Sequence, residues 1–529
     1  MPRIDKNKII YDQEDFLAGY SLQGGIASGN VVKAGKGFNW GQNITNTRYL
    51  GYITTCPSPT SPTDSALVTT PVVASIKAYD VTAGSCDYLL TGSTGTLHVL
   101  STLAVTPVIQ NGASYPHAID HAHTAEIGCD LIAYRHNLLG TLTNSIFYSF
   151  RDNTDWDVGC VKNNDTVSIA FDDDFMSTVP ATPLAGGDLT YGKDYPHPMI
   201  VGTDGNLYIG SGRYLHCYEG TNGTNGTFLA NVLTLPSNFV ITCFEKQGEL
   251  LLIGGFYSVK GGFITDGGRA AIFVYNYLDQ VISQEIPIDD EYLATLFIWN
   301  GQVAGVTTGE VGIRGNTRVR VLNGTNFEQV AEFNTLVDPN SNTNFLPAYH
   351  GGVDYVAKQL LINCGGTVYA VAMPYDTSKY EVTNPYKVAV GNGSVVSNRG
   401  ASGIWVSGAG CPFKFVTGFN TGTFETNAAT PGFTGYNKAR IKGITVFFKG
   451  VFANGRTFEG KVITDEGSQT FCSEDTLTGD RVKKYLKTTT GVPFNDFTFL
   501  YLQLNWTGAG TTEGAIIDRI EIEIEPITI

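Results

Sequence analysis

Short apolar runs alternate with glycine-containing turns along most of the chain. In "VGTDGNLYIGSGRYLHCYEG", residues 201–220, apolar and aromatic side chains recur at Leu207, Ile209 and Tyr214, and a Gly-Ser-Gly turn divides the stretch. Alternation with a period of two is typical of a half-buried strand, and a glycine turn between two such runs is typical of a hairpin. The stretch therefore predicts an antiparallel pair, which we assign as the inner pair of one structural repeat.

Looser relatives of this hairpin recur over much of the sequence. They occupy residues 86–100, 129–152, 248–276, 300–324, 358–374 and 402–418. Several four-stranded repeats arranged in a ring form a β-propeller, whose repeats span about 40–50 residues. We therefore predict an all-β protein with a six- or seven-bladed β-propeller over residues 61–435. A stack of β-sandwiches is the alternative.

The two ends of the chain differ from this repeat. Residues 1–60 show few regular strands and predict an N-terminal extended arm, with one strand that could complete a blade. Residues 436–529 contain longer runs, and Ile520, Ile522 and Ile524 share one face of a strand that presents glutamates on the other. This alternation is typical of a sheet with one buried face, so we predict a C-terminal β-sandwich over 436–529.

Composition narrows the classes of function. The net charge of −15 argues against sequence-specific nucleic-acid binding, which needs clustered Lys and Arg. The nine cysteines show no CxxC spacing, which indicates thiols rather than a disulfide framework. The N-terminal residues lack the apolar core of a signal peptide, and no apolar run is long enough for a membrane span. We expect synthesis in a cytoplasm and no membrane span.

Three stretches contain residue types that bind metals. His117, His121 and His123 would form a candidate zinc site, and Asp338, Asn340 and Asn342 would form a candidate calcium loop. A run of three aspartates at 172–174 is a second calcium candidate. All three stretches are equally typical of polar loops and turns, so no metal or cofactor is expected.

Catalytic motifs are weak. Residues 149–159 loosely match the Asp-box turn of sialidase propellers, a turn that carries no catalysis. The sequence shows no Gly-x-Ser-x-Gly elbow, P-loop or dinucleotide fingerprint. We therefore expect that the protein is not an enzyme. Trp156, Trp299 and Trp405 are candidate platforms for a sugar, although core packing is favoured for Trp299 and Trp405.

The layout as a whole resembles a known family. The N-terminal segment has a pattern of Asp15, Phe16, Gly19 and Gln23-Gly-Gly. Hairpins that end in "IFVYN" or "RVLNG" follow it, and one predicted blade contains the stretch 146–156. The last segment contains "YLQLNWTG" and "AIIDRIEIEIE". This order is similar to the β-propeller structural proteins of tailed bacteriophage virions, including nozzle-like tail components.

The resemblance implies a ring-forming structural protein of the virion that acts in assembly and in genome-channel closure or delivery. Copies of the chain and other virion proteins would be its partners, contacted through the arm and the sandwich. The arm residues Asp15, Phe16, Tyr20 and Gln23 are the candidate assembly contacts. The alternatives are a propeller that binds a host-surface receptor or glycan, and a glycoside hydrolase.

Overall fold

The computed structural model describes residues 9–14, 26–28, 31–33, 40–42, 44–45, 54–55, 57–60, 72–80, 84–91, 96–101, 117–118, 127–138, 140–152, 155–162, 170–176, 195–258, 267–277, 279–309, 317–333, 350–354, 359–364, 367–372, 381–387, 394–399, 404–407, 413–419, 422–425, 438–449, 457–474, 482–507 and 516–527. Every regular element within these residues is a β-strand. Among them we find no helix that is long and apolar enough to cross a membrane.

The chain forms two compact units, each built from separated segments. The ring unit consists of Thr60–Thr367 and Val388–Lys414, and the terminal unit of Met1–Pro59, Val368–Lys387 and Phe415–Ile529. The predicted division at 1–60, 61–435 and 436–529 differs from this grouping. It separated the N-terminal segment from the C-terminal sandwich, and it assigned residues 368–387 and 415–435 to the propeller. Both ends of the chain belong to one unit.

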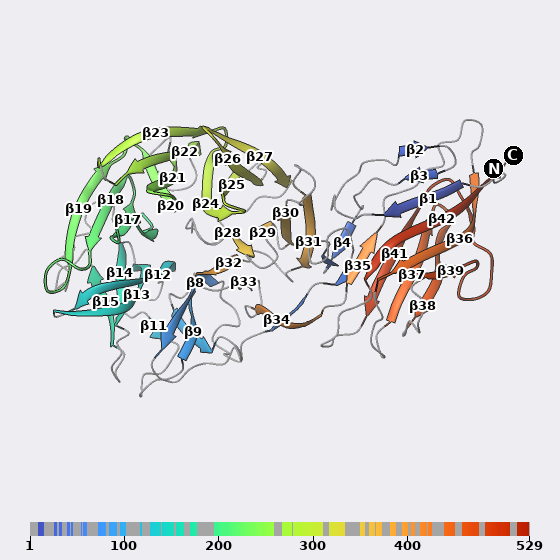
Figure 1. The fold of residues 1–529 in the computed structure, drawn as a ribbon, viewed down its shortest axis with the longest axis horizontal. Coiled ribbons are helices and arrows are strands. Elements are labelled where there is room, and N and C mark those ends of the chain that lie inside the picture. Colours follow the sequence, from blue (N-terminus) through green and yellow to red (C-terminus); the bar gives the residue numbers. More distant parts are fainter. Residues whose placement is uncertain are drawn as a thin grey trace. The chain divides into compact units, whose positions relative to one another are not determined.

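Five four-stranded antiparallel blades follow one another within the described part of the ring unit (Figure 1). They are β8 (Val72–Asp80), β9 (Gly84–Thr91), β10 (Thr96–Ser101) and β11 (His117–Ala118); β12 (Ile127–Leu138), β13 (Thr141–Asp152), β14 (Asp155–Lys162) and β15 (Ala170–Met176); β16 (Met199–Val201), β17 (Leu207–Ser211), β18 (Tyr214–Glu219) and β19 (Thr227–Thr234); β20 (Phe239–Gln247), β21 (Leu250–Ser258), β22 (Gly267–Asn276) and β23 (Val281–Ile288); and β24 (Tyr292–Trp299), β25 (Gln302–Thr308), β26 (Thr317–Asn323) and β27 (Asn326–Phe333).

Two further blades complete the series among the described strands. In the sheet order, β28 (His350–Asp354) is followed by β29 (Gln359–Cys364), β30 (Thr367–Ala372) and β31 (Glu381–Lys387). Likewise, β32 (Ser394–Arg399) is followed by β33 (Ile404–Ser407), β34 (Phe413–Phe419) and the N-terminal strand β7 (Pro57–Thr60). The described strands thus make seven blades, which confirms the predicted β-propeller and selects the larger of the two blade numbers.

The first strands of the seven blades form a closed ring within the ring unit. Each contacts the first strand of the next blade, from β8 through β12, β16, β20, β24 and β28 to β32. The ring closes through β32, which pairs in parallel with β28 at His350↔Val395 and with β8 at Asn398↔Ser75. The 201–220 hairpin was assigned as an inner pair, and this is wrong. It forms the middle strands β17 and β18, because β16 precedes them on the inner side.

Strand β7 has a sequence suited to the outer edge of a blade. Its residues Pro57, Ser58, Pro59 and Thr60 place prolines at alternate positions. Because proline has no N–H, such a strand can donate ladder hydrogen bonds from only one of its edges. The pairing of β7 with β34 and with no other described strand agrees with this.

A β-bulge recurs in the inner strands of four blades. The register shifts at Val72/Ala74 in β8, at Gly128/Asp130 in β12, at Ile241/Cys243 in β20 and at Leu293/Thr295 in β24. A bulge bends a strand and increases its twist. The repeat seen in the sequence is therefore also a repeat of backbone geometry.

The terminal unit contains a β-sandwich, as predicted. One sheet has the order β2 (Ile26–Ser28), β3 (Val31–Lys33), β1 (Ile9–Glu14), β42 (Ile517–Ile527), β36 (Lys438–Phe448) and β39 (Val482–Tyr485), with β40 (Asp496–Phe497) also paired to β36. The other has the order β38 (Gly467–Glu474), β37 (Thr457–Thr464), β41 (Leu500–Thr507), β35 (Gly422–Glu425) and β4 (Trp40–Gln42). A separate pair is formed by β5 (Ile44–Thr45) and β6 (Thr54–Thr55).

The core of the sandwich follows the predicted alternation. Ile520, Ile522 and Ile524 of β42 are buried and belong to one apolar cluster with Leu502 and Trp506 of the opposite sheet. The N-terminal segment takes part in both sheets, because β1 pairs antiparallel with β42 and β4 pairs with β35. Residues near the two ends of the chain therefore fold together.

Candidate functional site

Most of the site residues predicted from the sequence lie outside the described residues. This applies to His121, His123, Asp338, Asn340 and Asn342, and to the arm residues Asp15, Phe16, Tyr20 and Gln23. His117 begins the outer strand β11, where its partner in the ladder is Leu97. Among the described residues, no group of three or more His, Cys, Asp or Glu is arranged to hold a metal ion.

The aspartate run at 172–174 lies on β15, and two of its members are half-buried. The Asp173 carboxylate accepts a hydrogen bond from the Tyr148 hydroxyl. Burial, followed by the charge of Asp173, raises the pKa of Tyr148 well above its usual value. Within the part of the chain that the structure describes, Asp172 and Asp173 are not part of any group of three or more His, Cys, Asp or Glu that could hold a metal ion.

The three candidate tryptophans are core residues. Trp156 and Trp299 are 1% exposed and Trp405 is 0% exposed. Core packing of Trp299 and Trp405 is thus confirmed. Trp156 as a sugar platform is wrong, because its indole is enclosed by the apolar cluster between the first two blades.

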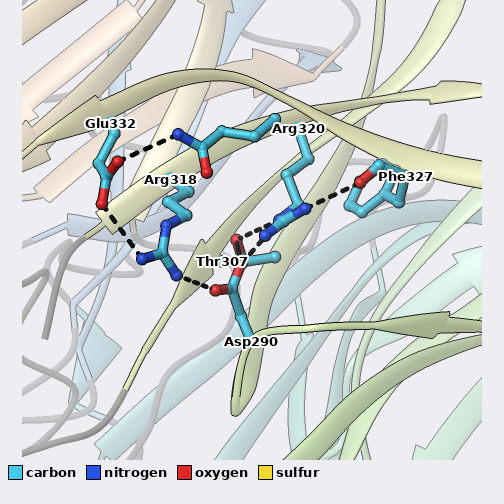
Figure 2. A network of polar contacts seen from close by, with 7 residues as sticks. Asp290, Thr307, Arg318, Arg320, Phe327 and Glu332 are labelled. Carbon is cyan, nitrogen blue, oxygen red and sulfur yellow. Dashed lines mark hydrogen bonds and ion pairs between the residues drawn. The ribbon is translucent and has the colours of Figure 1, made fainter.

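A network of buried polar contacts surrounds Asp290, in the connection between β23 and β24 (Figure 2). Its carboxylate is buried and accepts hydrogen bonds from Thr307, Arg318 and Arg320, the last at 2.7 Å. Arg320 also donates to the Phe327 carbonyl at 2.9 Å. The sequence analysis did not identify this network, although the Arg-Val-Arg-Val alternation of β26 places both arginines on one face.

The network is balanced in charge. Arg318 bridges Asp290 and Glu332, and its distance to the Glu332 carboxylate is 3.1 Å. Burial would raise the pKa of Asp290, but hydrogen bonds from Arg320 and Thr307 and the positive charges of the two arginines outweigh it and lower that pKa. Asp290 is therefore a poor general acid, because that role requires a carboxyl that holds its proton near neutral pH.

Asp290 joins the fourth and fifth blades. Its backbone carbonyl accepts a hydrogen bond of 2.8 Å from the Ala270 amide in β22, while its side chain bonds β25 and β26. A second contact joins the same blades closer to the centre, where the Thr242 hydroxyl of β20 donates to the Leu293 carbonyl of β24 at 2.7 Å. These groups hold the two blades in a fixed relation.

Similar polar contacts join the second and third blades. The Asp130 carboxylate of β12 accepts a hydrogen bond of 2.7 Å from the Met199 amide of β16. His197, which is completely buried, lies 2.9 Å from the Trp156 carbonyl in the second blade and 3.1 Å from the Gly210 carbonyl in the third. The bond to Asp130 satisfies the buried Met199 amide. A neutral imidazole carries one N–H, so His197 donates to one of the two carbonyls beside it.

One buried arrangement has the chemistry of a nucleophile and a base. His136 Nε2 lies 2.9 Å from the Ser145 hydroxyl, and Nδ1 lies 3.0 Å from the Tyr218 hydroxyl. The Tyr218 hydroxyl donates to the Asn225 carbonyl at 2.6 Å, so it accepts from His136. Because His136 and Ser145 are 0% and 1% exposed, no substrate reaches them in this structure. The arrangement again joins the second and third blades.

His197 gives the propeller a defined sensitivity to acid. Burial, and then the proximity of His216, lower its pKa from 6.5 to about 3. Between pH 6.5 and about pH 3, His197 is protonated in the unfolded chain but not in the folded chain. The contribution of His197 to stability is therefore complete above pH 6.5 and declines as the pH falls toward 3. The free energy of unfolding should fall by at most about 1.4 kcal/mol per pH unit from this residue.

The measurement is urea unfolding of the full chain at a series of pH values, for the wild type and for His197→Asn. We expect a shallower dependence of stability on pH in the variant, whatever its stability at neutral pH. Equal slopes in the two proteins would show that His197 is not the responsible group.

Comparisons with known proteins add structural likeness alone. No family model and no curated protein matches the chain. An exo-β-1,3-galactanase from Phanerochaete chrysosporium is similar at 11% identity and a TM-score of 0.34, covering 88% of this chain and 99% of that one. The Dos1 propeller is similar at 13% identity and a TM-score of 0.38, covering 66% and 92%. The β-propeller domain of Cps50 (Swd1) from Myceliophteria thermophila is similar at 9% identity and a TM-score of 0.38, covering 66% and 99%.

These findings correct the expectation that the protein is not an enzyme. The exo-β-1,3-galactanases are enzymes, and their similarity to this chain removes the basis for that exclusion. The identity of 11% and the TM-score of 0.34 carry no argument for a particular activity of this chain.

Proposed function

We propose that the chain is a structural component of a bacteriophage virion that assembles with other copies into a ring. The resemblance in layout noted from the sequence motivates the proposal. The observation that supports it best is the way the ring unit is held together. Its first strands close on themselves through β32, and buried side chains bond adjacent blades to each other.

This construction suits a part that bears load. Pulling two blades apart would leave Asp290, Asp130 or His197 without its partners in the neighbouring blade. Leaving a buried polar group unpaired costs about 1–3 kcal/mol, and more for a charged group. The joints therefore resist separation of the blades in addition to the apolar contacts between them.

The burial of the inner strands β20 and β24 limits where a genome channel could lie. All residues from Phe239 to Phe244 in β20 and from Tyr292 to Phe297 in β24 are buried. These inner strands therefore do not border a water-filled passage. In the proposed assembly, a channel for the genome is therefore not lined by β20 or β24.

Electron microscopy of the native protein and of the particles that contain it tests the proposal. We expect ring-shaped assemblies of the purified chain, and labelled antibodies bound at the tail or neck of the virion. A monomer that is absent from every particle would refute the proposal. A galactan hydrolysis assay and a glycan array on the same preparation test the hydrolase and the glycan-binding alternatives.

A further inference from the structure

Strand β39 combines exposed apolar residues with positive charge at the end of a sheet. Val482 is 47% exposed, and Leu486, immediately after the strand, is 59% exposed. Lys483, Lys484 and Lys487 are interspersed with them. Among the described strands, β39 pairs only with β36, so one of its edges has no ladder partner there. An edge of this kind can accept a strand from another molecule.

The apolar surface continues from β39 onto the outer face of the same sheet. Phe447 of β36 lies directly across from Val482 in the register, and the Arg519 guanidinium lies 5.1 Å from the centre of its ring. Leu486 extends over Gly443, where an added Cβ would lie 3.2 Å from a methyl carbon of that leucine. The exposed leucine and valine therefore flank Lys484 on one side of the sheet.

Lysines on an edge strand by themselves have an ordinary explanation, because they discourage unwanted pairing. That explanation does not account for the two large apolar side chains beside them. Nor does it account for Lys484, whose charge is already paired with Glu523 at 3.1 Å. Apolar residues interspersed with positive charge instead fit a partner strand that is apolar and acidic.

The ring unit carries an edge strand with the opposite charge. Strand β27 is the last strand of its blade, and its exposed residues include Glu328 and Glu332, the latter paired with Arg318 at 3.1 Å. It contains no proline over eight residues. The outer strand β23 of the preceding blade has Pro287, which removes one backbone donor from that edge. Of these two acidic edges, β27 is therefore the better template for pairing.

We propose that β39 of one copy pairs edge to edge with β27 of a second copy. Two β39 strands facing each other would bring lysines together, which is unfavourable. The contact is therefore heterologous, and repeated contacts of this kind build rings or filaments. The inference rests on the proposed function, because it names the surface through which copies of the ring would assemble.

Charge reversal in the full-length chain tests the contact. Lys483→Glu with Lys487→Glu should weaken self-association by about tenfold or more in sedimentation velocity, because it places glutamates against glutamates. Glu328→Lys alone should weaken it similarly. A mixture of the two variants should associate again, since each supplies the edge that complements the other. Glu249→Lys, in the exposed turn before β21, is the matched control and should associate as the wild type does.

The outcomes separate the two proposals. If the wild type forms rings and the lysine variant forms them equally well, β39 is not the contact and the proposed function stands. If the wild type stays monomeric at all concentrations, both the ring and the contact are refuted. Unchanged thermal unfolding of each variant establishes that a loss of association is not a loss of folding.

Discussion

Replacing Asp290 with alanine should lower the free energy of unfolding of the ring unit by about 3–5 kcal/mol. The substitution leaves Arg320, whose side chain is 9% exposed, without the carboxylate that faces it at 2.7 Å. It also removes the acceptor of the Thr307 hydroxyl and one of the two carboxylates bound by Arg318. An isolated buried charge is strongly unfavourable, so the effect exceeds that of losing a surface ion pair.

Chemical denaturation monitored by tryptophan fluorescence measures this effect. Glu332→Gln is the matched control, since Glu332 pairs with the same Arg318 at a side chain that is 35% exposed. Exposed ion pairs contribute about 0–1 kcal/mol, so the control should remain close to the wild type. An equal loss in the two variants would show that burial of Asp290 does not govern its contribution.

A second pair of variants keeps the prediction testable if Asp290→Ala fails to fold. Arg320→Met removes the buried cation, and the double variant with Asp290→Ala removes both charges. We expect the double variant to be more stable than the sum of the single losses implies, because neither charge is left alone. Additive losses would contradict the role of Asp290 as the partner of Arg320.

Deleting residues 1–30 should destabilise the sandwich and spare the propeller ring. The deletion removes β1, which pairs with β42 over six residues from Ile9↔Ile524 to Glu14↔Arg519, and it removes β2. Strand β42 supplies Ile520, Ile522 and Ile524 to the sandwich core. Loss of its neighbour exposes a long sheet edge next to that core, and such an edge promotes aggregation.

Calorimetry of the full chain and of the truncated chain measures this effect. We expect one unfolding transition at the wild-type temperature, from the ring unit, and a second that moves down by several degrees or disappears. Deletion of residues 1–8 is the control, because it leaves β1 complete. Loss of the ring transition after the longer deletion would show that the N-terminal strands are needed by the ring unit as well.

The truncated chain also tests the assembly role assigned to the N-terminal segment. We expect the 1–30 deletion to be absent from virions or strongly reduced in them, and the 1–8 deletion to be incorporated. Normal incorporation of the longer deletion would contradict an assembly role for residues 1–30.

The fold class followed from local pattern alone. The hairpin repeat predicted a propeller, and the alternation of Ile520, Ile522 and Ile524 with glutamates predicted a sheet with one buried face, because a period of two reports directly on which side of a strand is buried. The blade number was left at six or seven, since the last blade takes β7 from residues 57–60 and its other strands from beyond residue 394. No local pattern reveals a pairing over that distance.

The polar network around Asp290 depended on the tertiary structure for a related reason. Asp290, Thr307 and Arg320 come from three separate segments, and each by itself is an ordinary polar residue in a strand or a turn. The candidate tryptophan platform Trp156 was misassigned because exposure depends on the neighbouring blade, which the local sequence does not report. By itself, the sequence determined the strands, their buried faces and the ring of blades. Only the tertiary structure decided how the ring closes, which charges are buried together and which edges stay exposed, because these properties arise between segments that are distant along the chain.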